Sequence, residues 1–561
     1  MIREDIRTLI AAAVSELRAE QGWDLAEMPV FDVSRVKDER FGDYATNIAM
    51  ILAGPLGRSP MEIAEEIVAR VASHESREEK ERFEKIEVAR PGYINFTLSV
   101  PILTDVLRII IDKQGRFGDS EIGVGKKVLL EFISANPTGP IHLGNARGGP
   151  LGDSLSLVLK KAGYAVTNEY YVNDYGNQVR VLGHSILKDE EAQYRGGYVD
   201  DLAEELNGTD VSREALPVGM WAAGRILEQL IKPVCAKASI RFDNWFSEKS
   251  LHDSGEVSAV LDLLREKDLT YEKEGAIWFR STEFGDDKDR VLVKSDEEKT
   301  VTYTAPDFAY HKNKIDRGFN ILINIQGADH HGQAAVVGRF VEDVLGAKDV
   351  VKLILTQFVK IMQDGVEVKM SKRRGTYYAL DDLIEEVGKD AVRFIFSSYA
   401  ATSHIVFDID LALERSAKNP VYYVQYAHAR LASVLRKAEE AGIHQGPSLT
   451  SRTVLDTADL SLLTHPKERE LLRELSSFPE LIEGVAETYA VHHLPQYAIR
   501  IADKLHSFYA DCRVIDPENP ELTKARLALV SGVKIVLRET LGLLGIDAPE
   551  RMESVSANNE Q

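Results

Sequence analysis

Residues 127–145 read KVLLEFISANPTGPIHLGN, and this stretch decides the fold. Its first part, Lys127 to Ile133, is an apolar run of strand length that ends before Asn136-Pro137. Apolar residues at helical spacing follow the turn: Leu151, Leu155, Val158 and Leu159. A second strand-like run covers residues 165–172. Strand, glycine-containing turn, helix and strand within this length predict a βαβ unit.

The turn between strand and helix has the composition of a phosphate site. Its glycines leave backbone N–H groups accessible, and the helix that follows presents the positive end of its dipole. His142 and Asn145 are three residues apart, so both can donate hydrogen bonds to one phosphate chain. A turn built of small residues alone would not offer these donors.

A second loop, far away in the sequence, carries cations. Residues 369–375 read KMSKRRG, with Lys369, Lys372, Arg373 and Arg374 before a glycine. Ammonium groups that close on the charge of a departing pyrophosphate lower the barrier to attack on an α-phosphate. Alone, this loop could also be a solvated basic segment. Paired with the first loop, it predicts a site that activates a carboxylate with ATP.

The two loops resemble the signature sequences of class I aminoacyl-tRNA synthetases, His142-Leu143-Gly144-Asn145 and Lys369-Met370-Ser371-Lys372-Arg373. Longer strings narrow the resemblance to the arginyl-tRNA synthetases of bacterial type: FGDYATN at 41–47, residues 134–149, EYYVND at 169–174, GADHHG at 327–332 and APERM at 548–552. The resemblance implies an α/β chain. Its parts are a class I Rossmann-like nucleotide-binding catalytic domain with an insertion, a small α+β N-terminal domain and an all-α helical-bundle C-terminal domain.

These parts can be assigned to ranges of the chain. We expect the N-terminal domain at 1–115 and the catalytic domain at 116–385, with its insertion at about 181–300. The helical domain is expected at 386–552, in a region that reads as nearly pure helix, and a polar tail at 553–561. The resemblance implies that the first domain contacts tRNA and that the helical domain binds the anticodon.

Composition and charge are those of an ordinary soluble protein of three or four domains. With no run of 18 apolar residues and no apolar signal core at its start, the chain is expected to be cytoplasmic. Cys235 and Cys512 lie far apart in the sequence and support neither a disulfide framework nor a zinc site. The net charge, 68 − 89 = −21, leaves a nucleic-acid partner undecided, because an acidic protein can carry a local basic track.

The resemblance also assigns an arginine site. A guanidinium is best met by carboxylates in fork geometry beside an aromatic face. The implied residues are Glu131, Ser134, Asn136, Glu248, Tyr303, Asp307 and Gln326. Without the resemblance, Tyr303 and Asp307 could be a surface helix pair, and Glu248 a solvated acid. Glu131 is the more unusual residue, because buried acids are rare unless they are paired.

The implied ATP site consists of Pro137, Gly139, His142, Gly144, Asn145, Gly327, Asp329, His330, Met370, Ser371 and Lys372, and the implied catalytic residues are His142, Asn145, Lys369 and Lys372. The class signature usually ends in histidine, whereas the amide of Asn145 can donate but cannot carry positive charge. Asp329 and the two histidines after it could suggest a metal, but adjacent side chains diverge. We therefore expect no metal site, no zinc and no organic prosthetic group, and Mg²⁺ that arrives with ATP.

Together these features predict an arginine–tRNA ligase. It would form arginyl-adenylate from ATP and arginine and transfer the arginine to the 3′ end of tRNA(Arg). The expected partners are tRNA(Arg), arginine and ATP, with no DNA and no membrane, and the expected state is a monomer. The alternatives are a class I synthetase for cysteine or glutamate, and a tRNA-binding paralogue that has lost catalysis. The lack of cysteine clusters disfavours a cysteine enzyme, and the acids at the side-chain end of the site disfavour a glutamate enzyme. The intact lysine loop disfavours a paralogue that has lost catalysis.

Overall fold

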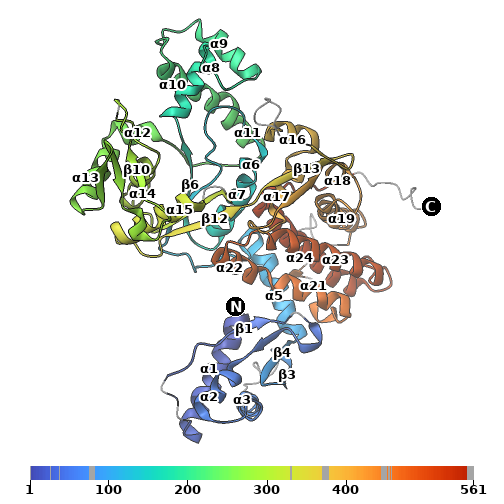
Figure 1. Cartoon of the computed structure of the whole chain (residues 1–561). Helices are drawn as coiled ribbons and strands as arrows, with labels where there is room; N and C mark the ends of the chain where they lie inside the picture. Colours follow the sequence, from blue (N-terminus) through green and yellow to red (C-terminus); the bar gives the residue numbers. More distant parts are fainter. Residues whose placement is uncertain are drawn as a thin grey trace. The chain divides into compact units, whose positions relative to one another are not determined.

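The computed structural model of the chain describes residues 2–23, 25, 27–36, 38–74, 82–297, 299–328, 331–368, 378–443, 452, 455–456 and 458–552. The chain divides into two compact units, which are described separately below. Unit 1 contains Met1–Phe117, Arg430–Phe478 and Arg500–Val536, and unit 2 contains Gly118–Ala429, Pro479–Ile499 and Leu537–Gln561. Figure 1 colours the chain from blue to red and labels its elements.

Unit 1 begins with an antiparallel sheet of strand order β1-β2-β4-β3. Its strands are β1 (Val33–Arg35), β2 (Tyr44–Thr46), β3 (Phe83–Ala89) and β4 (Tyr93–Leu98). The accompanying helices are α1 (Ile2–Gln21), α2 (Ile48–Leu56), α3 (Pro60–His74) and α5 (Val100–Lys113). Alternation around Pro91-Gly92 predicts two paired strands, and β3 and β4 do pair, with Val88 opposite Ile94. The α+β character expected for this part of the chain is confirmed.

Unit 2 is built on a parallel sheet of strand order β12-β11-β5-β6-β7. Its strands are β5 (Lys127–Glu131), β6 (Ala165–Val172), β7 (Asn244–Ser247), β11 (Ile321–Gly327) and β12 (Val351–Thr356). Between β5 and β6 the chain forms α6 (Leu143–Ala146) and α7 (Gly148–Lys161). The predicted βαβ unit is therefore present. Most of β5 is buried, as expected for a strand with covered faces in a parallel sheet.

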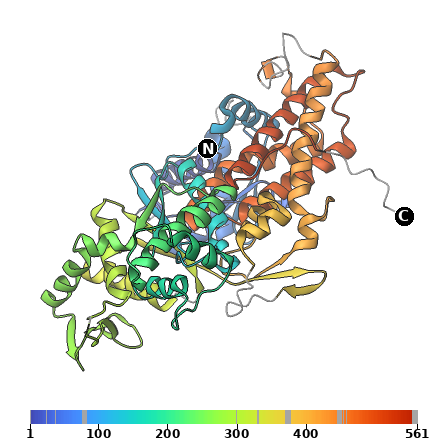
Figure 2. The same cartoon turned by 90° about the horizontal axis from the view of Figure 1, so that it is seen from above.

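Long segments interrupt this sheet after β6 and after β7. The first holds α8 (Asn177–Leu187), α9 (Gly197–Leu206), α10 (Ala215–Ile226) and α11 (Lys232–Lys237); α8 to α10, green in Figures 1 and 2, pack on one another. The second holds α12 (Glu248–Asp253), α13 (Glu256–Glu266), β8 (Thr270–Lys273), β9 (Ala276–Phe279), β10 (Arg290–Val293) and α14 (Thr304–Asp316). The strand-like run at residues 290–294, followed by a charged turn, predicts a hairpin, and the structure pairs this strand, β10, with the preceding strand β9.

A second sheet in unit 2 has strand order β14-β13-β15. It follows α15 (His331–Arg339) and β12, and its strands are β13 (Val359–Gln363), β14 (Val366–Val368) and β15 (Ile405–Asp408). The helices around it are α16 (Leu380–Val387), α17 (Lys389–Ser397) and α18 (Ile409–Leu413). Strand β15 corrects the expectation of nearly pure helix beyond Gly388. Four residues are too few for periodicity to reveal a strand, and β15 depends on its pairing with β13.

Beyond α18 the described residues are mainly helical, as expected. The helices are α19 (Pro420–Glu440), α21 (Pro466–Ser476), α22 (Phe478–Thr488), α23 (His493–Asp511) and α24 (Pro520–Leu543), drawn in orange and red in Figure 2. Helix α19 begins at Pro420, a residue that suits a first helical position because it lacks an N–H. The Ser-, Thr-, Asp- and Gly-rich sequence of residues 442–465 predicts a loop, much of which lies outside the described residues.

Candidate active site

The order of strands reverses at the junction between β5 and β11. The chain moves from β5 outward through β6 and β7, then crosses to β11 and β12 on the other side of β5. In open α/β sheets, ligands bind at such a reversal, outside the carboxyl ends of the strands. Residues 132–145 leave this edge after β5, and Ala328 leaves it after β11. Two predicted nucleotide-binding segments therefore start at the expected place.

Contacts from β6 hold the start of the turn after β5. Ile133 and Ser134 have φ of 66° and 39°, values that L residues rarely adopt. The hydroxyl oxygen of Ser134 accepts a hydrogen bond from the backbone N–H of Tyr171 at 3.1 Å. The hydroxyl of Tyr170 donates to the carbonyl of Ala135 at 2.7 Å. A backbone in this rare conformation persists because its surroundings fix it.

His142, Gly144 and Asn145 lie together at the start of α6. His142 is the N-cap residue, and the backbone N–H of Asn145 donates to its carbonyl at 3.0 Å. A Cβ on Gly144 would lie only 3.0 Å from the imidazole of His142. The imidazole therefore rests against the glycine backbone, where a larger residue would displace it.

Arg147 directly follows this turn and is buried. Its guanidinium donates to the backbone carbonyls of Gln357, Ser403 and Ala400 at 2.7, 2.7 and 2.8 Å. Burial lowers its pKa to about 10, so it stays protonated at neutral pH. Because Gln357 lies between β12 and β13, Arg147 ties the first signature turn to the strands that lead to residues 369–375. Sequence analysis missed Arg147; its signal was a lone arginine among small residues at a helix start.

The charges of three predicted arginine-binding acids act on the hydroxyl of Tyr171, near the end of β6. Tyr171 is 8% exposed, and its ring contacts that of Tyr310. Burial raises the pKa of Tyr171 well above 10.0, and the charges of Glu248, Asp307 and Glu131 raise it further. The charges of three carboxylates change the pKa of one hydroxyl only when all three carboxylates lie close to it. Acids from β5, α12 and α14 therefore converge here, around a tyrosine that sequence analysis did not assign to the site.

A buried chain of hydrogen bonds connects two of these acids. Nζ of Lys314 donates to Oε2 of Glu131 at 2.7 Å and to Oδ1 of Asn324 at 3.2 Å. Nδ2 of Asn324 lies 2.9 Å from Nε2 of His311, whose Nδ1 lies 2.8 Å from the carbonyl oxygen of Asp307. Lys314 has no exposed surface. The chain fixes the end of β5 relative to the first turn of α14.

The protonation of His311 follows from this arrangement. Burial lowers its pKa well below 6.5, and the nearby charge of Lys314 lowers it further. His311 is therefore neutral: Nδ1–H donates to the carbonyl of Asp307, and Nε2 accepts from the amide of Asn324. Asp307, His311 and Lys314 are spaced i, i+4 and i+7 on α14, so they share one helix face. That polar face was a sequence signal that could have revealed His311 and Lys314.

Glu169 lies beneath this cluster and is fully buried. The guanidinium of Arg317 donates to both of its oxygens, at 2.6 and 2.8 Å. The hydroxyl of Tyr310 and Nδ2 of Asn244 donate to it at 2.7 and 2.6 Å. Burial favours the protonated acid, but the hydrogen bonds from Arg317, Asn244 and Tyr310 outweigh burial and lower the pKa of Glu169. Tyr310, which contacts Tyr171, is thus held at both its ring and its hydroxyl.

Glu248 and Tyr303 have different surroundings. Glu248 begins α12 directly after β7 and is 8% exposed, with Nε2 of His252 3.8 Å from its Oε1. Tyr303 precedes α14, is 63% exposed and lies beside Arg290 of β10. The carboxylate is therefore inside the cluster, whereas the predicted aromatic neighbour of the substrate lies at the surface.

The predicted residues of the first turn are partly accessible. Nδ2 of Asn136 donates to Oε1 of Gln178 at 2.6 Å, which directs its amide toward α8. Pro137 is buried and Gly139 is half-buried. These residues share a turn with His142 and lie at the same sheet edge as the three acids.

Gln326 and Gly327 end β11 and are half-buried. The carbonyl of Gln326 accepts a hydrogen bond from the hydroxyl of Thr356 at 3.2 Å. The other predicted nucleotide and catalytic residues lie outside the described residues, and their roles stay predictions: Asp329, His330, Lys369, Met370, Ser371 and Lys372.

Among the described residues, no group of three or more His, Cys, Asp or Glu side chains could hold a metal ion. In the same part of the chain, no helix has the length and apolarity to cross a bilayer. Cys235 and Cys512 are free and buried, and burial raises the pKa of Cys235 to about 12.

Comparison with known proteins gives the family. The arginyl tRNA synthetase N terminal domain matches residues 4–98, the class I (R) catalytic domain of tRNA synthetases matches 106–204, and the DALR anticodon binding domain matches 424–552. Arginine–tRNA ligase 1 of Halalkalibacterium halodurans is 41% identical over 570 residues, with 98% of each chain covered. The chain belongs to the arginyl-tRNA synthetases. The arginine–tRNA ligase of Bacillus subtilis is likewise 41% identical over 571 residues, with 98% of each chain covered.

A solved arginyl-tRNA synthetase from Thermus thermophilus has the same fold, with a TM-score of 0.72 at 22% identity. The match covers 98% of this chain and 100% of the other. The expected fold class, a Rossmann-like catalytic domain between an α+β and a helical domain, is confirmed. Membership in this family also confirms the expected enzyme class, an aminoacyl-tRNA synthetase, and rejects the cysteine and glutamate alternatives.

Proposed function

We propose that this arginyl-tRNA synthetase selects arginine with the three acids around Tyr171 and joins it to tRNA(Arg) in two steps. In the first, an oxygen of the arginine α-carboxylate attacks the α-phosphorus of ATP, and pyrophosphate leaves with the electron pair of the broken bond. In the second, a hydroxyl of the terminal ribose of tRNA attacks the carbonyl carbon of arginyl-adenylate, and AMP leaves. The observation that carries this proposal is the convergence of the acids beside the signature turn, where a buried chain of hydrogen bonds joins Glu131 to Asp307.

The charge of the cluster suits arginine. Glu131, Glu248 and Asp307 bring three negative charges, and Lys314 cancels one of them (−3 + 1 = −2). Arginine brings two cationic groups, a guanidinium and an α-ammonium. An uncharged side chain in this place would leave buried carboxylates without a partner, which costs more than the lost contact itself. Selection against neutral amino acids therefore needs no separate editing site.

The residues divide between the two ends of the substrate. Glu248 and Asp307 take the guanidinium, with the ring of Tyr303 beside it. Glu131 takes the α-ammonium through the oxygen that Lys314 does not bind. The remaining contacts, to the amino and carboxylate ends, come from Ser134, Asn136 and Gln326. Proximity and orientation of the α-carboxylate toward the α-phosphate supply much of the rate in such a reaction.

The nucleotide lies across the reversal between β5 and β11. The proposed ATP-binding residues are Pro137, Gly139, His142, Gly144, Asn145, Gly327, Asp329, His330, Met370, Ser371 and Lys372. His142 and Asn145 donate to the phosphates, while Lys369 and Lys372 neutralise the charge that develops as pyrophosphate leaves. Mg²⁺ enters bound to ATP, because this ion is usually held by substrate phosphates and water rather than by a site made of protein ligands alone.

The other domains belong to the same proposal. In this proposal the domain at residues 1–115 contacts tRNA. The domain at residues 116–385, with an insertion at about 181–300, catalyses the reaction. The domain at residues 386–552 binds the anticodon, and residues 553–561 are a polar tail. We further propose that the enzyme acts in the cytoplasm as a monomer, with no DNA or membrane partner. Light scattering after gel filtration, with and without tRNA(Arg), measures the oligomeric state.

ATP–pyrophosphate exchange tests the proposed function. The assay is run with each of the twenty amino acids and with citrulline, in the presence and absence of tRNA(Arg). Citrulline matches arginine in shape but carries a neutral urea group. We expect exchange with arginine alone, and a kcat/KM for citrulline lower by about 10⁴, as for sites whose buried polar groups lose their partner. The family implies that this exchange requires tRNA.

Each other outcome has a distinct meaning. Robust exchange with lysine or glutamate would refute selection by the acid cluster. Comparable use of citrulline would show that shape, not charge, selects the substrate. No exchange with any amino acid, despite tRNA binding, would identify a paralogue that has lost catalysis, with Asn145 in the signature as a candidate cause.

A further inference from the structure

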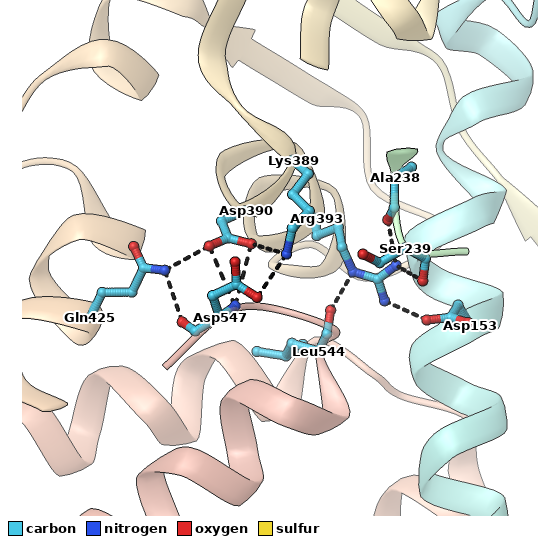
Figure 3. A network of polar contacts seen from close by, with 9 residues as sticks. All are labelled: Asp153, Ala238, Ser239, Lys389, Asp390, Arg393, Gln425, Leu544 and Asp547. Carbon is cyan, nitrogen blue, oxygen red and sulfur yellow. Dashed lines mark hydrogen bonds and ion pairs between the residues drawn. The ribbon is translucent and has the colours of Figure 1, made fainter. Parts of the chain in front are cut away.

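A second buried arginine, Arg393, joins three elements of unit 2 (Figure 3). It lies in α17 and has no exposed surface. Its Nε donates to the carbonyl of Leu544 at 2.6 Å, and Nη1 donates to the carbonyls of Ala238 and Ser239 at 2.9 and 3.0 Å. Nη2 donates to Oδ2 of Asp153 at 2.6 Å. The forked guanidinium thus meets four acceptors from three separate parts of the chain.

Two of these parts are the C-terminal ends of helices. Ala238 and Ser239 follow α11, the last helix before β7, and Leu544 follows α24, the last long helix of the chain. The last carbonyls of a helix lack partners within it and carry the negative end of its dipole. Arg393 supplies both ends with donors and with a positive charge.

The third part is the helix of the first signature turn. Asp153 lies in α7, which starts at Gly148 directly after the turn that contains His142 and Asn145. Its Oδ1 also accepts from the backbone N–H of Arg241 at 3.3 Å, and its side chain is 5% exposed. The Arg393–Asp153 pair therefore connects the turn's own helix to the end of α24.

Gly545 allows the end of α24 to lie close to this arginine. Its φ of +66° suits a glycine that ends a helix, and a Cβ there would overlap the guanidinium of Arg393. Polar contacts hold the residues just beyond it: Nζ of Lys389 donates to Oδ1 of Asp547 at 2.9 Å, and Nε2 of Gln425 donates to the carbonyl of Asp547 at 2.9 Å (Figure 3). The segment after α24 is therefore held by contacts from both α17 and α19.

We propose that Arg393 is a positioning residue that fixes α7, and with it the signature turn, to the C-terminal end of the helical domain. The rate of arginine activation then depends on how the end of α24 is held. This inference rests on the proposed roles of His142 and Asn145 and adds a residue that touches no substrate. A buried pair that served stability alone could be replaced by apolar residues without loss. Four directed hydrogen bonds instead define one relative position of three elements.

The test compares two glycine substitutions with the same backbone strain. Gly545→Ala places a methyl group against the guanidinium, whereas Gly442→Ala, at φ +67°, meets nothing within 4 Å. Both variants are assayed as full-length enzyme by arginine-dependent ATP–pyrophosphate exchange with tRNA(Arg), and their thermal unfolding is measured. We expect kcat to fall at least tenfold for Gly545→Ala at a temperature where both variants are folded. KM for arginine should stay within twofold, because the acids around Tyr171 do not touch Arg393.

Arg393→Lys provides a second measurement if Gly545→Ala does not fold. A lysine keeps the charge beside Asp153, but its single ammonium cannot reach both helix ends in the fork geometry of arginine. We expect a reduced kcat with an unchanged KM for arginine. Equal kcat in all variants and in the wild type would reduce Arg393 to a stabilising residue and overturn the proposal, as would a fall in kcat shared equally by Gly442→Ala. Failure of the proposed function itself looks different, because the wild type would then lack arginine-dependent exchange.

Discussion

The buried pair between Lys314 and Glu131 allows a quantitative test of the arginine site. Nζ of Lys314 lies 2.7 Å from Glu131, 3.2 Å from Asn324 and 4.0 Å from the ring centre of Tyr310, and Lys314 has no exposed surface. Lys314→Met keeps most of the volume but leaves the carboxylate of Glu131 buried without its cation. Removing one partner of a buried pair costs about 3–5 kcal/mol. We expect a loss of that size in the free energy of unfolding.

The double variant separates charge from packing. In Glu131→Gln/Lys314→Met neither member of the pair is charged, so most of the lost stability should return, with a coupling energy of at least about 2 kcal/mol. The KM of the double variant for arginine should nevertheless be higher than that of the wild type, because Glu131, the proposed ligand of the α-ammonium, has lost its charge. Stability is measured by urea unfolding with circular dichroism, and KM by pyrophosphate exchange.

Lys312→Met is the matched control on the same helix. Lys312 pairs with Asp316 at 2.6 Å, but both side chains reach solvent, with exposed fractions of 39% and 60%. Such a pair contributes about 0–1 kcal/mol. If Lys314→Met costs no more than Lys312→Met, water reaches the Lys314–Glu131 pair, and the reasoning about this buried cluster is wrong.

Three further predictions use other parts of the site. Asp307→Asn removes one charge from the guanidinium fork, at a cost of about 1.5–3 kcal/mol, and should raise KM for arginine far more than KM for ATP; equal effects would make Asp307 structural. Lys372→Ala should slow adenylate formation by about 10²–10³ in single-turnover assays and largely spare transfer from preformed adenylate, since pyrophosphate has left by then. The depressed pKa of His311 keeps it neutral when folded, while the unfolded chain takes up a proton below pH 6.5. Stability should therefore fall as the pH drops below 6.5, by up to about 1.4 kcal/mol per pH unit, and His311→Gln should remove this contribution.

Local patterns in the sequence predicted the scaffold of the site well. The apolar run at 127–133 became β5, because a strand that is buried in a parallel sheet is mostly apolar. The strand-like run at 165–172 became β6. The dipeptide Asn419-Pro420 indicates a helix start for an equally local reason, the missing N–H of proline, and α19 begins at Pro420. Such signals need no knowledge of tertiary contacts.

The buried charges could not be predicted in the same way. Arg147, Lys314 and Arg393 are cations that sequence statistics assign to the surface, yet all three are buried. Their partners lie far away along the chain: the carbonyls around Arg147 come from residues 357–403, and Leu544 meets Arg393. Only the folded chain brings these groups within reach. The polar contacts that position the site are thus the part that sequence reading missed.

The reversal of strand order between β5 and β11 determines when a nascent chain gains its binding site. Glu131 and Gln326 lie on neighbouring strands but are 326 − 131 = 195 residues apart. At synthesis rates of about 5–20 residues per second, β11 follows β5 by roughly 10–40 s. During that interval the acid on β5 lacks Lys314 as well, because Lys314 is made only shortly before β11. Competence to bind arginine therefore arises late in translation, after more than half of the enzyme has been made.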